Sequence, residues 1–291
     1  MSIAHVLLAL LVILIWGFNF VVVKVGLASL PPLLFSGLRF LFAAFPLVFF
    51  VRRPKIPLRQ LAAYGLIQFT LQFALLFGGM RMGMTAGLSS LVIQLQAFFT
   101  VGLAVALLHE RPRPVQVIGG LIGLGGMLLV GLHIESRTTL VGFSMVIGAG
   151  AAWACANILA KRMGPLDALA LVGWASLIAA PPLFVLSYAL EGPAAIHAAL
   201  SNLDWKSWLA ILFQSYPNTI FGFGIWAFLI RRYPAATVAP FSLLIPVVGM
   251  LSGVLVLHEP LSGWTIVAGA LILFGLALNQ WGGRSRAPVR A

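Results

Sequence analysis

Charged side chains are scarce in this sequence. Asp, Glu, Lys and Arg make up 8% of its 291 residues, whereas 61% are hydrophobic and the mean hydropathy is +1.07. A soluble domain has about 25% charged residues, so this chain has too little polar surface to coat a water-soluble particle. The composition excludes a soluble globular enzyme, a disordered chain and a nucleic-acid-binding domain.

Residues with metal or catalytic chemistry are also few. One cysteine, Cys155, excludes an intramolecular disulfide and a cysteine-based metal cluster. The pairs His109-Glu110 and His258-Glu259 lack the second His of a zinc-binding helix, and the five histidines do not cluster. No Ser/His/Asp or Cys/His arrangement is visible. We therefore expect no catalytic residue, no metal and no cofactor, and the chain is not expected to be an enzyme.

Long apolar runs are abundant instead. A helix that spans a membrane needs about 20 mostly apolar residues. Ten such stretches occur, and the connections between them are short, which predicts an all-α integral membrane protein with ten transmembrane helices. The stretches are Ile3 to Val23, Pro32 to Val51, Leu61 to Gly79, Ala86 to Leu107, Val115 to Leu132, Leu140 to Ala160, Ala168 to Ala189, Trp208 to Ile230, Ala235 to Leu257 and Ser262 to Trp281.

The basic residues predict the orientation. With the N-terminus inside, 13 of the 18 Lys and Arg residues fall in cytoplasmic loops and the C-terminal tail, and 4 fall on the other side. Arg39 lies within the second stretch. Cytoplasmic loops of membrane proteins collect Lys and Arg, so we expect both termini in the cytoplasm. The net charge of +12 is the sum of this asymmetry and does not indicate a nucleic-acid partner.

The chain also repeats itself. His109-Glu110 recurs as His258-Glu259, 149 positions later, and several small residues align at the same offset. We interpret this as two five-helix repeats, residues 1–135 and 136–291. Five is odd, so the second repeat enters the membrane from the opposite side. Inverted repeats are characteristic of transporters, whose substrate site lies near the midplane between the halves.

Several short motifs accompany this architecture: Trp16 to Asn19 (Trp-Gly-Phe-Asn), Arg39 in the second stretch, and Glu110-Arg111-Pro112. With them the whole chain resembles the EamA branch of the drug/metabolite transporter (DMT) superfamily, most of all the YddG-type exporters of aromatic amino acids and methionine. The second copy reads Glu259-Pro260 without the spacer and departs from the pattern. The resemblance implies a ten-helix basket around a central cavity lined mainly by helices 1, 3, 4, 6, 8 and 9, with helices 2, 5 and 10 peripheral.

Amides and aromatic residues within the apolar stretches are the candidate cavity lining. Polar groups in hydrocarbon usually face the bundle interior, and amides can both donate to a carboxylate and accept from an ammonium group. Buried amides that simply join helices are the alternative. The predicted substrate-binding residues are Trp16, Asn19, Gln68, Gln72, Gln94, Gln96, Trp153, Asn157, Gln214, Tyr216, Asn218 and Trp226.

Other features of the stretches carry separate expectations. Pro217, Pro240 and Pro246 interrupt helices eight and nine and are predicted hinges, with structural kinks as the alternative. Arg39 could attract a carboxylate, but we favour a structural role because helix two is expected to be peripheral. Gly119 and its neighbours predict close helix packing. No acidic residue lies at mid-membrane depth, which favours uniport.

Together these features predict a multi-pass exporter of the bacterial inner membrane. The expected cargo is an aromatic or hydrophobic amino acid, methionine or a related small metabolite, moved by alternating access. The expected partners are this small-molecule substrate and the lipid bilayer, with the protein a monomer or a homodimer. The alternatives are export of another metabolite or drug, a membrane-embedded lipid-acting enzyme, and a non-transporting scaffold.

Overall fold

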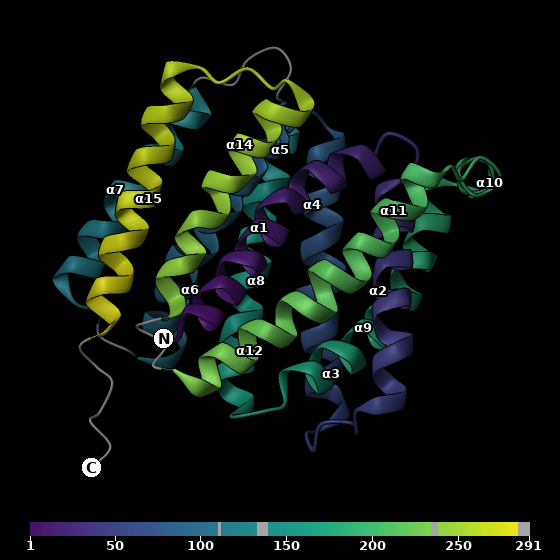
Figure 1. The fold of residues 1–291 in the computed structure, drawn as a ribbon, viewed down its shortest axis with the longest axis horizontal. Helices are drawn as coiled ribbons and strands as arrows, with labels where there is room; N and C mark the ends of the chain where they lie inside the picture. Colours follow the sequence, from purple (N-terminus) through teal and green to yellow (C-terminus); the bar gives the residue numbers. More distant parts are fainter. Residues whose placement is uncertain (110–111, 133–138, 234–237, 285–291) are drawn as a thin grey trace.

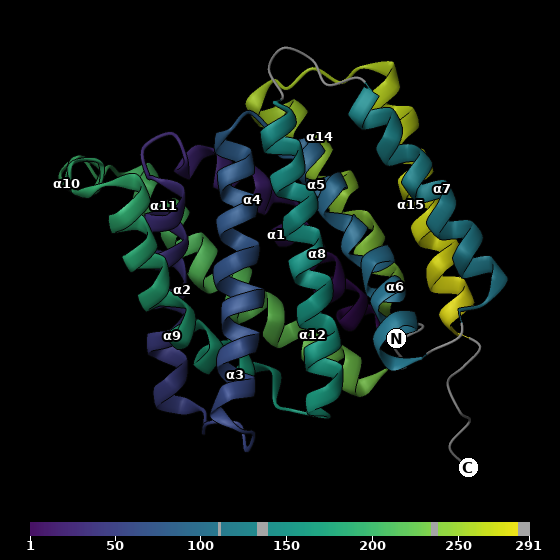
Figure 2. The same cartoon turned by 180° about the vertical axis from the view of Figure 1, so that it is seen from behind.

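The computed structural model describes residues 1–109, 112–132, 139–233 and 238–284, and every regular element in these parts is helical. The helices form one bundle, with α7 and α15 side by side along one edge (Figures 1 and 2). The predicted boundary between the repeats at residues 135 and 136 lies outside the described residues.

The first five predicted stretches each correspond to a helix or to helical segments in continuous succession. These are α1 (Ile3–Gly26), α2 (Pro32–Phe50), the third span α3 (Leu58–Gly65), η1 (Leu66–Leu71) and α4 (Gln72–Arg81), the fourth span α5 (Ala86–Val92), η2 (Ile93–Leu95) and α6 (Gln96–Leu108), and α7 (Pro114–Leu132).

The second five follow the same order, with one short helix added. They are α8 (Leu140–Met163), α9 (Ala168–Leu186) continued by η3 (Ser187–Glu191), the eighth span α11 (Trp205–Phe213), η4 (Gln214–Phe221) and α12 (Gly222–Arg232), the ninth span η5 (Ala239–Leu244) and α14 (Ile245–Leu257), and α15 (Gly263–Arg284). The added helix, α10 (Pro193–Ser201), lies in the connection that the sequence shows as a longer loop.

Eight of the described helices are long and apolar enough to cross a membrane, and the ninth span contributes a shorter apolar helix, Phe241–Leu257. The eighth span is helical from Trp205 to Arg232, but polar residues occupy its centre. Large apolar side chains such as Leu121, Leu128 and Phe274 are more than half exposed. Such an apolar exterior fits lipid as the surrounding solvent, so the all-α membrane fold is confirmed.

Glycine allows α7 and α15 to touch backbone to backbone. A Cβ built on Gly119 would lie 2.6 Å from the carbonyl oxygen of Gly275, and one on Gly126 would lie 2.9 Å from that of Ala268. In the alignment of the repeats at an offset of 149 residues, Gly119 corresponds to Ala268 and Gly126 to Gly275. Replacing each residue by its counterpart therefore turns the first contact into the second. The contact is therefore symmetric between the repeats, and the antiparallel pairing is what an inverted repeat requires.

Polar side chains define where helices begin. Thr85 Oγ1 accepts a hydrogen bond from Leu88 N (3.2 Å), and Asp204 Oδ1 accepts one from Ser207 N (2.8 Å). These N-caps satisfy backbone donors that have no partner within the helix. Hydrogen bonds from the hydroxyl and the N–H of Ser207 hold the pKa of the exposed Asp204 carboxyl below its usual range.

The fourth and ninth spans end alike. His109 follows α6 with φ 55°, and His258 follows α14 with φ 53°. Both histidines thus occupy the left-handed conformation that usually belongs to glycine at a helix C-terminus. In each case this turn redirects the chain before the acidic residue that comes next in the sequence, Glu110 or Glu259.

Two pairs of spans leave regular α-helical geometry at equivalent places. The third and eighth spans contain π-helical segments, η1 and η4. The fourth and ninth contain 3-10 segments, η2 and η5. In membrane proteins irregular backbone occurs where it is buried in protein or lines a cavity, and π turns are frequent at functional sites. These four segments therefore mark the part of the bundle to inspect for a site.

Candidate functional site

A cavity of about 100 Å³ lies among the irregular segments and receives side chains from seven spans. Polar and aromatic residues make up most of its wall. The lining residues are Trp16, Asn19 and Phe20 of α1, Arg39 of α2, Gln68, Gln72, Phe73 and Leu76 of the third span, Ile93 and Gln94 of η2, Trp153 of α8, Asn218 and Phe223 of the eighth span, and Ile245 of α14. We name this space the central cavity.

Two glutamines of the third span form one polar strip of the wall. Gln68 and Gln72 are both buried, and the Gln68 amide donates to Gln72 Oε1 across 2.5 Å. Gln68 lies within the π segment and Gln72 begins the α-helix that follows it. The pair thus meets on a single helix face, as the i, i+4 spacing predicts.

Trp16 joins the two halves at the cavity wall. Its Nε1 donates to the carbonyl oxygen of Asn218 across 3.0 Å, a group that the π segment makes available. A Cβ on Gly222 would lie 2.3 Å from this nitrogen, so only glycine admits the tryptophan here. The indole also packs against the rings of Phe223 (centroids 5.5 Å apart) and Trp226 (5.3 Å).

Seven of the twelve residues proposed from sequence reach the central cavity. They come from both repeats, although their sequence separation extends over 200 positions. They are Trp16, Asn19, Gln68, Gln72, Gln94, Trp153 and Asn218.

The other five lie elsewhere. Gln96 and Asn157 bond to each other, with Asn157 Nδ2 donating to Gln96 Oε1 across 2.9 Å, so this pair joins α6 to α8. Gln214 is fully buried, and its Oε1 accepts from Asn218 Nδ2 at 3.5 Å. Tyr216 is 40% exposed, and Trp226 stands behind Trp16. None of these five residues lines the central cavity in this structure.

The reason why these side chains lie off the cavity wall differs between the residues. Gln214 is buried beside Asn218 and accepts its hydrogen bond within the eighth span, whereas Tyr216 is two residues from Asn218 and lies on a different side of the helix. Gln96 and Asn157 satisfy each other's hydrogen bonds, which is the helix-joining alternative for buried amides.

The predicted hinge prolines lie in irregular segments or in the helical turn that directly follows one. Pro217 is inside η4, and Pro246 is in the first turn of α14, where a missing N–H costs little. Pro240 belongs to η5, and its side chain lies outside the described residues. However, η1 and η2 interrupt the first repeat without any proline, so irregular turns are not confined to the second repeat.

Arg39 is the cavity residue that sequence reasoning placed elsewhere. Helix two was expected to be peripheral, but its Arg39 is 1% exposed and lines the central cavity. Phe73 beside it was also missed, because an apolar residue in an apolar helix carries no distinguishing signal. A cation within a membrane span is itself such a signal, since buried charges in membranes are usually functional.

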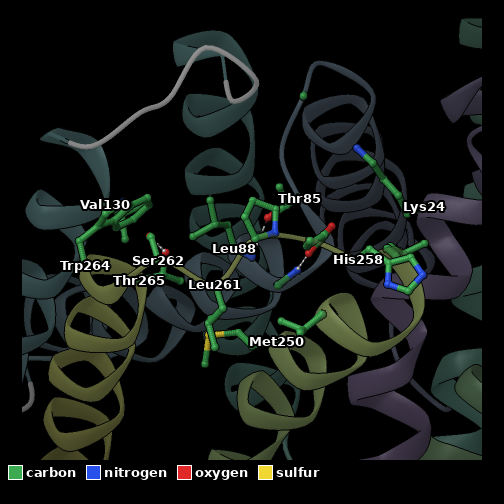
Figure 3. A pocket seen from close by; sticks show the side chains of 16 residues that line it. Lys24, Thr85, Leu88, Val130, Met250, His258, Leu261, Ser262, Trp264 and Thr265 are labelled. Atoms are coloured by element: carbon green, nitrogen blue, oxygen red, sulfur yellow. Dashed lines mark hydrogen bonds between the residues drawn. The ribbon is translucent and has the colours of Figure 1, made fainter.

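A second, larger cavity of about 410 Å³ lies toward one end of the bundle. Figure 3 shows Lys24 on one side of it and Val130 and Trp264 on the other. Glu259 belongs to its wall, and its carboxylate accepts from Ala86 N (2.7 Å) and Gly87 N (2.9 Å) at the start of α5. This acid already binds the helix N-terminus. We therefore place the candidate site in the central cavity, which unites polar side chains from both repeats and includes two buried atoms without a hydrogen-bond partner, Asn19 Oδ1 and Arg39 Nη1.

Comparisons with known proteins agree with this architecture. The model of the EamA-like transporter family matches residues 3–132 and again residues 140–280. The chain is 42% identical over 293 residues to a "Probable amino-acid metabolite efflux pump" of Escherichia coli (strain K12), covering 97% of each chain. It is 43% identical, with the same coverage, to a protein of the same description from Salmonella typhimurium.

More distant similarities extend over most of the chain. An "Uncharacterized transporter YoaV" of Bacillus subtilis is 28% identical over 283 residues, covering 93% of this chain and 94% of that one. A solved structure described as "Crystal structure of protein" has a TM-score of 0.65 at 18% identity, covering 99% of this chain and 100% of that one, and shows the fold alone. The two family matches and the helical bundle identify a membrane transporter and not an enzyme: the chain belongs to the EamA-like transporter family.

Proposed function

We propose that this protein exports amino acids and related small metabolites, with aromatic or hydrophobic amino acids and methionine as the preferred cargo. The observation that carries the proposal is the central cavity, whose wall combines neutral amides with aromatic rings. Amides suit both ends of a zwitterion, and rings suit an apolar side chain. The relatives in Escherichia coli and Salmonella typhimurium are described as probable amino-acid metabolite efflux pumps, which supports amino-acid metabolites as the class of cargo and export as the direction.

The proposed mechanism is alternating access around this cavity, with the predicted residues that line its wall holding the substrate: Trp16, Asn19, Gln68, Gln72, Gln94, Trp153 and Asn218. All six Asp and Glu residues lie outside the ten apolar stretches. Proton- or sodium-coupled carriers usually keep an ionisable group at mid-membrane depth, so we propose uniport. The excess of basic loop residues on one side supports cytoplasmic termini in a bacterial inner membrane. The working unit is a monomer or a homodimer.

The decisive experiment is transport by the purified protein in liposomes, with a panel of labelled amino acids. We expect uptake of methionine and aromatic amino acids down their gradients, unaffected by collapse of a pH gradient. Uptake of none of the panel by folded protein would remove the amino-acid assignment. Loss of transport on collapse of the pH gradient alone would remove uniport.

The structure supplies matched variants for the cavity. We expect Gln72→Ala and Trp153→Ala to impair transport without loss of expression, because both side chains line the wall. Gln96→Ala and Tyr216→Ala are the controls, since these residues lie off the cavity. Unchanged transport in both cavity variants would contradict the proposed site.

The hinge proposal needs its own variant. Pro217→Ala restores the N–H that proline removes from the eighth span. If the proline provides the hinge, turnover should fall while the KM for the substrate stays constant. If the π turn persists without it, as η1 does in the third span, turnover should be unchanged, and this result would remove Pro217 from the mechanism.

A further inference from the structure

Arg39 is a buried cation whose hydrogen bonding is incomplete. Its Nε and Nη2 both donate to Thr219 Oγ1, at 3.2 and 3.1 Å. Its Nη1 is buried and has no hydrogen-bond partner. The side chain as a whole is 1% exposed and belongs to the wall of the central cavity. The guanidinium group of Arg39 thus has unused hydrogen-bond donors, and it lies next to a space that a small molecule could enter.

None of the carboxylates in the described parts of the chain neutralises this arginine. Glu191 accepts from Leu33 N and Leu34 N at the start of α2, and Glu259 accepts from the start of α5. Asp167 and Asp204 cap α9 and α11. Since an arginine side chain does not lose its proton in proteins, the charge persists inside the bundle.

Aromatic rings replace part of the missing counter-charge. The guanidinium carbon of Arg39 lies 4.1 Å from the centroid of the Phe73 ring and 5.0 Å from that of Phe40. Cation–π contacts of this kind stabilise a desolvated cation but do not use the N–H groups of Nη1, which remain free for a carboxylate. Phe73 also lines the central cavity, so the rings keep the cation at the wall.

The same cavity contains an unpartnered acceptor. Asn19 is 7% exposed, and its Oδ1 is buried without a hydrogen-bond partner. An α-amino acid presents a carboxylate that needs donors and an ammonium group that needs an acceptor. The two unpartnered groups of the cavity therefore match the two ends of a zwitterion.

We propose that Arg39 is a substrate-binding residue that receives the carboxylate of the cargo, with Asn19 Oδ1 accepting from its ammonium group. This proposal rests on the proposed function and narrows it: the cargo must have a free carboxylate. Compounds in which an amide replaces that carboxylate should bind at least about tenfold more weakly, whatever their side chain. A bidentate arginine–carboxylate pair also fixes the orientation of the ligand, which leaves the apolar side chain to the rings of Trp16 and Phe223.

The test compares competitors and variants in the same liposome assay. Labelled methionine is the substrate, and the unlabelled competitors are methionine, methioninamide and the deaminated carboxylic acid with the same side chain. We expect both carboxylates to inhibit wild-type uptake and the amide to need at least about a tenfold higher concentration. Equal inhibition by methioninamide and methionine would overturn the proposal without any variant.

Variants then assign the effect to one side chain. We expect Arg39→Gln to raise the KM for methionine by roughly 10- to 100-fold, because a hydrogen-bonded charge pair is lost, and to lose the preference for carboxylates. Arg39→Lys retains the charge but not the fork, so its KM should lie between the two. An Arg39→Gln protein with wild-type KM and wild-type selectivity would overturn the proposal.

The variant Thr219→Val tests the alternative that Arg39 has only a structural role. It removes the acceptor that holds Nε and Nη2 but retains the cation at the cavity wall. We expect its preference for carboxylates over the amide to persist. Loss of that preference in Thr219→Val as severe as in Arg39→Gln would make Arg39 structural and contradict the assignment.

A binding readout separates this proposal from the proposed function. If the wild type transports none of the amino acids, the export assignment fails, and thermal unfolding of the purified protein then decides on Arg39. Ligands that bind the folded state raise its melting temperature. Stabilisation of the wild type, but not of Arg39→Gln, by the methionine-derived carboxylates supports the site, and no stabilisation of the wild type overturns it.

Discussion

The two repeats reach similar backbone shapes with different residues. The third span is interrupted by η1, which contains no proline, whereas its counterpart in the eighth span, η4, contains Pro217. Likewise Pro246 is the second residue of α14, and Ala97 is the second residue of α6. The difference teaches that proline accompanies these irregular turns but does not cause them. Three of the four segments, η1, η2 and η4, contribute a buried amide side chain to the central cavity.

The largest expected effect concerns the contact that relates the repeats. Gly119→Leu places a side chain against the carbonyl oxygen of Gly275 on α15. We expect it to lower the free energy of unfolding by about 3 kcal/mol or more, because overpacking against backbone cannot relax by a rotamer change. Thermal unfolding in detergent measures this.

The matched control lies on the same helix. A Cβ on Gly125 meets nothing within 4 Å, so Gly125→Leu should leave the melting temperature close to that of the wild type. Equal melting temperatures for Gly119→Leu and the wild type would mean that the α7–α15 contact does not hold the repeats together.

The second prediction transfers a proline between the repeats. Ala97→Pro should cost less than about 1 kcal/mol, because a proline in the first turn of a helix removes few hydrogen bonds. Val101→Pro, one turn further into α6, should cost about 3 kcal/mol. Chemical unfolding of both variants tests the equivalence of α6 and α14, and similar losses in the two variants would contradict it.

The third prediction concerns Glu259, a residue of the second repeat whose carboxylate binds the start of α5 in the first repeat. Glu259→Ala leaves Ala86 N and Gly87 N at the start of α5 without their acceptor, at an expected cost of about 1–3 kcal/mol. Glu259→Gln, which retains an oxygen acceptor, should lose less in the same thermal unfolding assay. If both variants were as stable as the wild type, this link would carry no stability.

The smallest expected effect is also the most symmetric. His109→Gly and His258→Gly should each stabilise the protein by about 0.5–1 kcal/mol, because glycine adopts a left-handed C-cap without strain. Because the two caps are equivalent, differential scanning measurements should give similar shifts. A destabilised His258→Gly would point to a contact of the imidazole with the larger cavity, whose wall includes His258.

The sequence predicts most of the fold, because membrane thickness fixes the length of each apolar run. The fifth span, expected at Val115 to Leu132, begins one residue earlier in the structure, at Pro114. The π and 3-10 turns were not predictable in this way, since they change the twist of a helix without changing its hydropathy.

For the same reason, the sequence predicts only part of the wall of the central cavity. Gln68 and Gln72 keep their common face, but in η4 the same spacing brings Asn218 to the cavity and leaves Gln214 off its wall. Arg39 was visible as a charge in a span. Its direction depended on how α2 packs against neighbouring helices, and one sequence contains no measure of that packing.

The symmetric contact between α7 and α15 has a consequence for how such a chain can arise. Gly119 of α7 contacts Gly275, the counterpart of Gly126, and Gly126 contacts Ala268, the counterpart of Gly119. The same reciprocal pairing defines an isologous dimer interface. A single five-helix unit inserted in both orientations would offer the same glycine face to its inverted copy. One substitution in an ancestral gene would then have improved both sides of the contact at once, before fusion allowed the two copies to diverge.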